Sequence, residues 1–360
     1  MDCLSEKLYK EGMAITKEFI QKPDIYIQKL MQLKSQYDYI IDTAFKAQLQ
    51  EFRAKQTQQF EKFVNHQEAR TAEYLVIYID TSMKSGRRAK SDTSVTESAK
   101  IGESIATIEE NADKFIDQVI CIFRLISDKD TFERHYKSHL SKRILDDKNK
   151  MNEDAEHQMI CKLKSECGSS FTTKLEQMFK DKKLYQKNNE DYKTQKRNNT
   201  TPGRDGGIDI DCKILTSGQW PSDVTKVGRT NKAGQNIDDD KKIEDNYGCY
   251  LPEEMKLAYE DYKRWYLNKQ SGRKLTLLPN WGQVEIKFKP KSSKTKNRTY
   301  TIITTTILTC VLAKFNEKSK WSIEELKNEF PDFRNDIMMC IVVLTNARHS
   351  AGLEMVELIF

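Results

Sequence analysis

Between residues 105 and 145 apolar side chains recur at intervals of three and four positions, which is the period of an amphipathic helix. Such a pattern buries its apolar stripe only against other helices or a sheet, so it commits this part of the chain to a packed helical domain. The pattern forms two successive faces, Phe115, Val119, Ile122, Phe123 and Ile126, then Phe132, Tyr136, Leu140 and Ile144.

Further helical patterns flank this run on both sides. Pro23 opens a long helix, and a second helix is expected near residues 73–84, before a polar loop at 86–102. Downstream, Asn152 or Asp154 caps a helix that ends at Gly168, and another helix follows from Phe171. Four or more long amphipathic helices with short joins predict a helical bundle.

The character of the sequence changes after Asp181. Residues 182–204 hold seven basic and two acidic side chains, and we expect a solvated loop there. Alternation at 208–214 predicts a half-buried strand, and 223–248 reads as a second loop. A helix starts near Pro252, and strand patterns follow at 274–278 and 283–288. This middle region is therefore predicted to be α+β.

The last part returns to helical patterns. Apolar residues between Ile302 and Cys310, among them Ile303, are expected to share one helix. Ser322 and Glu325 have capping-box spacing, and Pro331 precedes a helix over 333–346. Helix, short helix, turn and helix is the core of a winged-helix unit. The last helix has too few donors for a polyanionic groove, so we expect it to pack rather than to read DNA.

Taken together, these patterns predict a mainly α chain with an α+β middle. We expect a helical bundle over residues 1–181, a small α/β sheet domain over 182–298 and a winged-helix domain over 299–360. Charged residues make up 32% of the sequence and hydrophobic ones 38%, which fits an extended helical protein rather than a disordered one. A net charge of +6 on 360 residues does not by itself call for nucleic acid or membrane.

The sequence offers little catalytic chemistry. None of its eight cysteines has C-x-x-C spacing, and Cys121, Cys161 and Cys310 stand in apolar helical patterns that predict burial. His135 and His139 are one helical turn apart but lack a third ligand, so we interpret them as ordinary helix-surface or interface histidines. Phosphate-loop and nucleophile-elbow motifs do not occur in the sequence. We expect no enzyme activity, no metal and no cofactor.

Location and charge leave two further expectations. The sequence shows no signal-peptide pattern at Met1 and no apolar run of the ~18 residues that a membrane span needs, so we expect a protein of the cytoplasm and nucleus with no membrane partner. The stretch 287–298 holds six basic residues and no acid. It could bind nucleic acid or an acidic protein surface, or be a solvated hairpin tip.

Four ordered blocks resemble the cullin family. They are D-K-D-T-F-E-R-H-Y-K-S-H-L-S-K-R-I-L at 128–145, the run from Asp154 to Asp181, I-L-T-S-G-Q-W-P at 214–221, and the run from Tyr266 to Thr276. The resemblance extends over roughly residues 23–344. In cullins this region is a four-helix bundle, an α/β domain and a first winged-helix domain, in the order that the patterns predict.

The resemblance implies a non-catalytic scaffold subunit of a cullin-RING ubiquitin ligase. The family's α/β domain accepts a strand from a RING-box protein, which in turn recruits the ubiquitin-conjugating enzyme; cullin regulators are possible further partners. The implied RING-binding residues lie on or beside two strands, 208–215 and 283–288: Ile208, Ile210, Cys212, Ile214, Leu215, Trp220, Val284, Ile286 and Phe288. Alternatively, these strands only hold the α/β domain together.

The sequence departs from the family in two places. The N-terminal repeats that dock adaptors have no counterpart before about residue 20, and neither has the final winged helix with the lysine that a ubiquitin-like protein modifies. We therefore expect a truncated chain that keeps the RING-binding half. Two other functions stay open: a module that sequesters a RING subunit or a regulator, and a winged-helix nucleic-acid binder that uses residues 287–298.

Overall fold

A computed structural model describes residues 2–45, 49–66, 70–91, 101–146, 152–198, 207–225, 251–288, 299–318 and 320–345. The chain divides into two compact units, Met1–Leu184 with Lys213–Pro221, and Tyr185–Cys212 with Ser222–Phe360. Among the helices described, none is long and apolar enough to cross a membrane. The units do not test the predicted domain boundaries at residues 181 and 298, which stay predictions.

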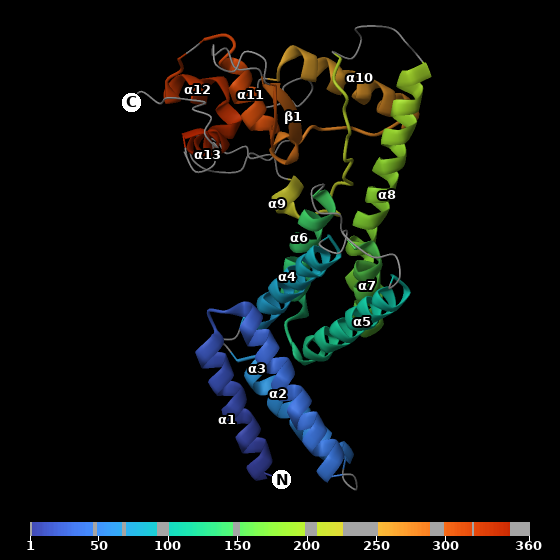
Figure 1. Ribbon diagram of the computed structural model, residues 1–360, viewed down its shortest axis with the longest axis vertical. Coiled ribbons are helices and arrows are strands. Elements are labelled where there is room, and N and C mark those ends of the chain that lie inside the picture. Colours follow the sequence, from blue (N-terminus) through green and yellow to red (C-terminus); the bar gives the residue numbers. More distant parts are fainter. Residues whose placement is uncertain are drawn as a thin grey trace. The chain divides into compact units, whose positions relative to one another are not determined.

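The first unit is made of helices (Figure 1). They are α1 (Asp2–Phe19), α2 (Pro23–Ala44), α3 (Leu49–Val64), α4 (Thr71–Ser91), α5 (Ile101–Leu125), α6 (Lys129–Leu145), α7 (Glu153–Cys167) and the first part of α8 (Ser169–Asn198). Helix α1 packs on α3, α2 on α4, α4 on α6, and α5 on α7. One apolar core runs through them and includes both predicted faces of the 105–145 pattern.

Local signals fix where several of these helices begin and end. Pro23 is the first residue of α2, where its missing N–H is not needed. Asp128 caps α6 by accepting a hydrogen bond from the Thr131 amide at 2.9 Å. Asn152, one of the two predicted caps, does the same for α7, and Gly168 ends that helix with φ +83°.

Two predicted loops are wrong in part. Helix α8 continues through the polar stretch to Asn198, because a narrow stripe of Tyr185, Asn188 and Tyr192 is buried at helical spacing while Lys, Glu and Gln favour a helix on its open side. The loop expected at 86–102 is also shorter, since α4 extends to Ser91 and α5 begins at Ile101. Residues 92–100 lie outside the described part.

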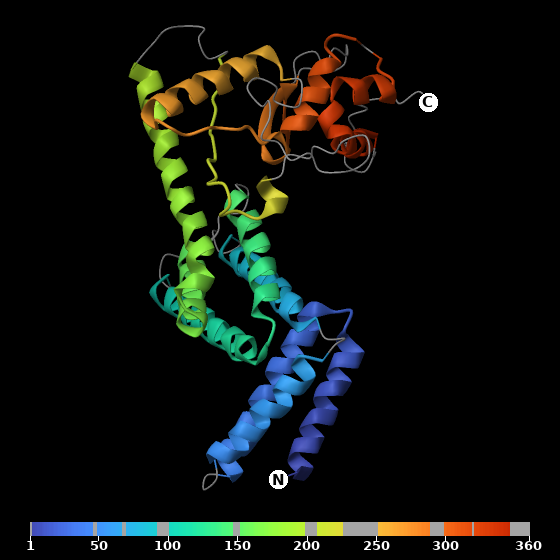
Figure 2. The ribbon, with the colours of Figure 1, turned by 180° about the vertical axis from the view of Figure 1, so that it is seen from behind.

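The second unit combines helices with one hairpin. It contains the rest of α8, then α9 (Ser222–Thr225), α10 (Glu253–Lys269), β1 (Gln283–Phe288), β2 (Tyr300–Thr305), α11 (Thr306–Lys314), α12 (Ile323–Glu329) and α13 (Arg334–Thr345), with short 3₁₀ turns at Pro279–Trp281 and Pro331–Phe333. Strands β1 and β2 pair antiparallel, with Val284 opposite Thr304 and Ile286 opposite Ile302. The rear view in Figure 2 shows the hairpin beside α11.

A second core lies among α11, α12 and α13. Phe330, Phe333 and Ile337 are at its centre, together with Cys310 and Val311 of α11. The predicted capping box is confirmed, because Ser322 accepts from the Glu325 amide and the Glu325 carboxylate accepts from the Ser322 amide. A mainly helical fold with a small sheet is therefore confirmed, while the winged-helix assignment stays a prediction.

Three predictions of local structure are wrong. Ile302 and Ile303 lie in β2 rather than in a helix, since the run of β-branched residues before Thr306 favours a strand and Thr305 caps α11. Residues 274–278 have no strand. Residues 208–215 lie in no helix and join no ladder in the described structure, although Figure 1 shows their trace as extended. Alternation alone therefore found the extended backbone and not its pairing.

Candidate partner-binding site

The extended segment 208–215 is held along one edge by side chains of α8. In the second unit, Lys196 Nζ donates to the Ile208 carbonyl at 3.1 Å, and the Cys212 amide donates to Asn189 Oδ1 at 3.1 Å. Residues 208 and 212 have the same parity, so in an extended chain their backbone groups point to the same edge. Helix α8 thus takes the place of a neighbouring strand on this inner edge.

The side chains of the segment alternate as the sequence predicted over its first half. Asp209 and Asp211 are exposed, while Ile208, Ile210 and Cys212 are half-buried. Burial, with a smaller contribution from the charge of Asp211, raises the pKa of the Cys212 thiol to about 12. One face of the segment is therefore apolar and the other carries charge.

An aromatic group of α8 and α10 lies next to this segment in the second unit. The rings of Tyr192, Tyr262 and Trp265 contact one another with centroids 4.9–5.5 Å apart. Tyr262 is fully buried and donates to Asn189 Oδ1 at 3.3 Å, so one amide oxygen accepts from both α10 and the segment. Burial raises the pKa of Tyr262, which keeps its hydroxyl a donor at neutral pH.

The outer edge of the segment is not paired within the described chain. The backbone N–H and C=O groups of Asp209 and Asp211 have no hydrogen-bond partner among the described residues. An extended chain with one satisfied and one open edge can accept a further strand. The exposed Asp211 carboxylate forms an ion pair with Lys193 at 2.7 Å, which fixes its side chain without using its backbone.

The chain that follows belongs to the first unit and is anchored there. Lys213 Nζ donates to the Leu145 carbonyl at 2.8 Å, and Leu215 packs against the core. Trp220 is only 3% exposed and lies within that core. Its indole N–H donates to Asp181 at 2.8 Å, and the Thr216 amide donates to the same carboxylate. Trp220 is therefore an anchor of the segment.

The other predicted partner-binding residues, Val284, Ile286 and Phe288, lie on β1. Val284 and Ile286 are half-buried, and all three pair with residues of β2. The described structure contains no ladder between β1 and the 208–215 segment.

Sequence reasoning did not identify Asp181 and Asn189 as residues that hold the segment. The one signal that could have pointed to Asp181 is that the N–H of a buried Trp needs a hydrogen-bond acceptor.

The sequence matches two models of protein families. Residues 1–189 match the cullin alpha solenoid domain, and residues 214–355 match the cullin alpha+beta domain. The chain belongs to the cullin family. Cullin-3 of Dictyostelium discoideum is 31% identical over 342 residues, which cover 94% of this chain and 38% of that protein.

Other cullins are similar to a comparable extent. Cullin-3 of Caenorhabditis elegans is 30% identical over 80% of this chain and 32% of its own length. Cullin-4A of Mus musculus is 30% identical over 85% of this chain and 34% of its own length. The chain thus spans about a third of the length of the cullins that it matches.

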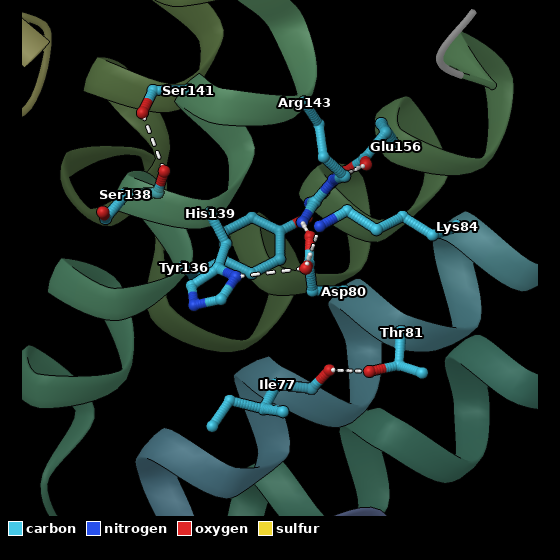
Figure 3. Close-up of polar contacts among 10 residues, drawn as sticks. All are labelled: Ile77, Asp80, Thr81, Lys84, Tyr136, Ser138, His139, Ser141, Arg143 and Glu156. Atoms are coloured by element: carbon cyan, nitrogen blue, oxygen red, sulfur yellow. Dashed lines mark hydrogen bonds and ion pairs between the residues drawn. The ribbon is translucent and has the colours of Figure 1, made fainter. Parts of the chain in front are cut away.

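His139, one of the two histidines a helical turn apart, takes part in a polar network. His139 Nδ1 lies 3.3 Å from Asp80, which also binds Lys84 and the guanidinium of Arg143 (Figure 3). Arg143 is 2% exposed and binds both carboxylate oxygens of Glu156, at 2.6 and 3.1 Å. In the described residues no group of three or more His, Cys, Asp or Glu could hold a metal ion. The network instead ties α4, α6 and α7 together.

Charge pairing governs this network. Burial alone would raise the pKa of Asp80, but hydrogen bonds from His139, Lys84 and Arg143 hold it well below its ordinary value. Burial would likewise lower the pKa of Arg143, and the charge of Glu156 raises it instead. Asp80 and Arg143 are therefore both charged at neutral pH, and the two buried charges compensate one another.

The cysteines of this cullin differ in exposure. Cys310 is buried as predicted, Cys121 is half-buried and Cys161 is exposed. The prediction for Cys161 is wrong because the buried face of α7 runs through Ile160 and Leu163, and Cys161 points away from both. Of the basic stretch 287–298, residues 289–298 lie outside the described part.

Helix α13 packs one face into the second core and exposes another. Its exposed residues are apolar: Met338, Met339, Val342 and Val343. Arg334 is the one basic residue of the helix. A helix with so few donors is poorly suited to a phosphate backbone, which agrees with its interpretation as a packing helix.

Proposed function

We propose that this chain is a non-catalytic scaffold part of a cullin-RING ubiquitin ligase, which holds a RING-box subunit by strand addition to the 208–215 segment. The RING-box subunit would recruit the ubiquitin-conjugating enzyme, and the cullin would set its distance from a substrate. We further propose that the protein works in the cytoplasm and nucleus.

The observation that supports this proposal best is the open outer edge of the segment. Backbone hydrogen bonds to Asp209 and Asp211 would give affinity for an added strand, and the apolar side chains of the segment would contribute to specificity. The inner edge is already occupied by Asn189 and Lys196, so a partner strand has one edge to bind. Membership of the cullin family supports the choice of a RING-box protein as that partner.

A pair of substitutions at one position tests strand addition. Asp211→Pro removes the backbone donor on the outer edge, whereas Asp211→Asn changes the side chain and keeps the donor. We expect the proline variant to lose affinity for a co-expressed RING-box subunit by about 1–3 kcal/mol, roughly ten- to a hundredfold in Kd, because an acceptor of the partner strand is left without its donor. The asparagine variant should bind almost as the wild type does, measured by isothermal titration calorimetry.

Equal binding by the two variants would show that the segment is not the docking strand. A further assay separates a ligase scaffold from a module that only sequesters the RING subunit. The complex is incubated with activating enzyme, charged conjugating enzyme and ubiquitin. Faster discharge of the conjugating enzyme than with the RING subunit alone supports the scaffold, and slower discharge supports sequestration.

The absence of ligase chemistry in the chain itself is tested separately. Cys161 is the cysteine most accessible to a thioester reaction among those described, because it is exposed. Without a RING protein, we expect no ubiquitin thioester on the chain, as judged by a reducible shift on a gel. A shifted band that disappears in Cys161→Ser would contradict the non-catalytic assignment.

A further inference from the structure

Asp181 is a buried carboxylate whose partners in the described structure are neutral. It is 3% exposed and accepts four hydrogen bonds: from Gln177 Nε2 at 3.0 Å, the Thr216 amide at 2.8 Å, Thr216 Oγ1 at 2.9 Å and Trp220 Nε1 at 2.8 Å. Among the described residues no Lys, Arg or His comes within 4.0 Å of it. A buried carboxylate without a cation is costly unless such donors fill its acceptor sites.

Three of the four bonds go to the chain just after the 208–215 segment. Thr216 follows Leu215 directly, and the turn from Thr216 to Trp220 is closed by a bond from the Gln219 amide to the Thr216 carbonyl at 3.3 Å. Gly218 takes φ +79° in this turn, a conformation that favours glycine. Asp181 therefore joins α8 to the chain just after the segment. It does so through the amide and the hydroxyl of Thr216 and through the indole N–H of Trp220.

We infer that Asp181 is a positioning residue for the docking segment: by binding Thr216 and Trp220 it fixes the end of the segment at Ile214 and Leu215, so that this end is already ordered before a partner strand arrives. This inference rests on the proposed function. A preordered edge lowers the conformational entropy that strand addition loses, so it acts on affinity without touching the partner.

Two substitutions at Asp181 separate the contacts that matter. Asp181→Asn keeps one oxygen that can accept from the Thr216 amide and Trp220, and its amide can donate to Thr216 Oγ1. Asp181→Leu leaves the Thr216 amide and the indole N–H without an acceptor. We expect Asp181→Leu to raise the Kd for the RING-box subunit roughly tenfold, and Asp181→Asn to change it less than about threefold.

A matched core variant excludes general destabilisation as the cause. Leu75→Ala on α4 removes a fully buried side chain of the same unit that lies outside the segment and makes no hydrogen bond to it. We expect it to lower the Tm at least as much as Asp181→Leu while leaving the Kd unchanged. Amide hydrogen exchange in the free chain should become faster at Ile214 and Leu215 in Asp181→Leu only.

The outcomes are distinguishable. If the wild-type chain fails to bind a RING-box subunit, both the proposed function and this inference are overturned. If the wild type binds and Asp211→Pro does not, the proposed function stands. In that case, wild-type affinity in Asp181→Leu, or an equal loss in Leu75→Ala, overturns the positioning role alone.

Discussion

Asp80 and Asp181 both belong to the first unit and both are largely removed from solvent, but the groups that hold them differ in charge. Asp80 binds Arg143, Lys84 and His139, whereas Asp181 accepts from neutral donors in the described chain. The partners of Asp80 lie on helices α4 and α6, and Arg143 links it to Glu156 of α7. The main partners of Asp181 lie in an irregular turn.

The difference follows from what each region has to satisfy. Helices satisfy their own backbone, so side chains that join them can be charged pairs, and a rigid guanidinium suits two carboxylates at once. The turn after the docking segment has amides that lack a ladder partner, and a carboxylate can accept from several of them. The stability of the chain should therefore fall when the network around Asp80 loses its cation, Arg143. It should also fall when the neutral donors of the turn lose their acceptor, Asp181.

Arg143→Met should have the largest effect, because it leaves Glu156 and Asp80 without the guanidinium. Removing one partner of a buried ion pair costs about 3–5 kcal/mol. Lys84→Met is the control, since Lys84 is the half-exposed partner of Asp80 and should cost under about 1 kcal/mol. Urea unfolding measures both free energies. Equal losses in the two variants would mean that Arg143 is not the centre of the network.

Asp181→Leu should cost less, because it leaves neutral donors unpaired and no charge. Each buried donor without a partner costs about 1–3 kcal/mol, and relaxation of the turn can return some of them to water. We expect a loss of about 2 kcal/mol in urea unfolding, on the same principle. Thr216→Val, which removes the hydroxyl and keeps the amide, should be milder. A loss larger than that of Arg143→Met would contradict the order derived from charge.

The contrast also marks what the sequence could and could not predict. The stripe Phe132, Tyr136 and Leu140 has a local period, so the helix and its buried face were predictable. The continuation of helix α8 beyond residue 181 was not predicted. Its buried stripe, Tyr185, Asn188 and Tyr192, consists of residues with polar groups, so the sequence alone does not mark it as a buried face. The role of Asp181 was missed because Thr216 and Trp220 lie 35 and 39 positions away, a separation that no local pattern encodes.

Acid titration should sharpen the comparison further. The pKa of Asp80 is lower in the folded chain than its ordinary value, so the unfolded chain binds its proton first as the pH falls. Its contribution to stability is therefore complete above about pH 4, the ordinary value for Asp, and is lost progressively below it. Stability of Asp80→Asn should fall less steeply than that of the wild type between about pH 4 and pH 2. Free energies of unfolding measured in urea provide the test. An equal fall in the wild type and in Asp80→Asn over this pH range would contradict the lowered pKa of Asp80.

The smallest loss of stability is expected at Ser322. There, as at Asp181, side-chain oxygens accept hydrogen bonds from backbone amides, but the groups lie at the surface. Its hydroxyl accepts from the Glu325 amide at 3.1 Å, and the Glu325 carboxylate accepts from the Ser322 amide at 2.9 Å. These groups are exposed, so water replaces any bond that is lost, and Ser322→Ala should cost only about 1 kcal/mol. Ser322→Asp, which keeps a capping oxygen, is the control and should be close to the wild type. The same urea experiment compares the free energies of unfolding of Ser322→Ala and Asp181→Leu. Equal losses in the two variants would contradict the idea that burial makes the hydrogen bonds of Asp181 more important for stability than the exposed bonds between Ser322 and Glu325.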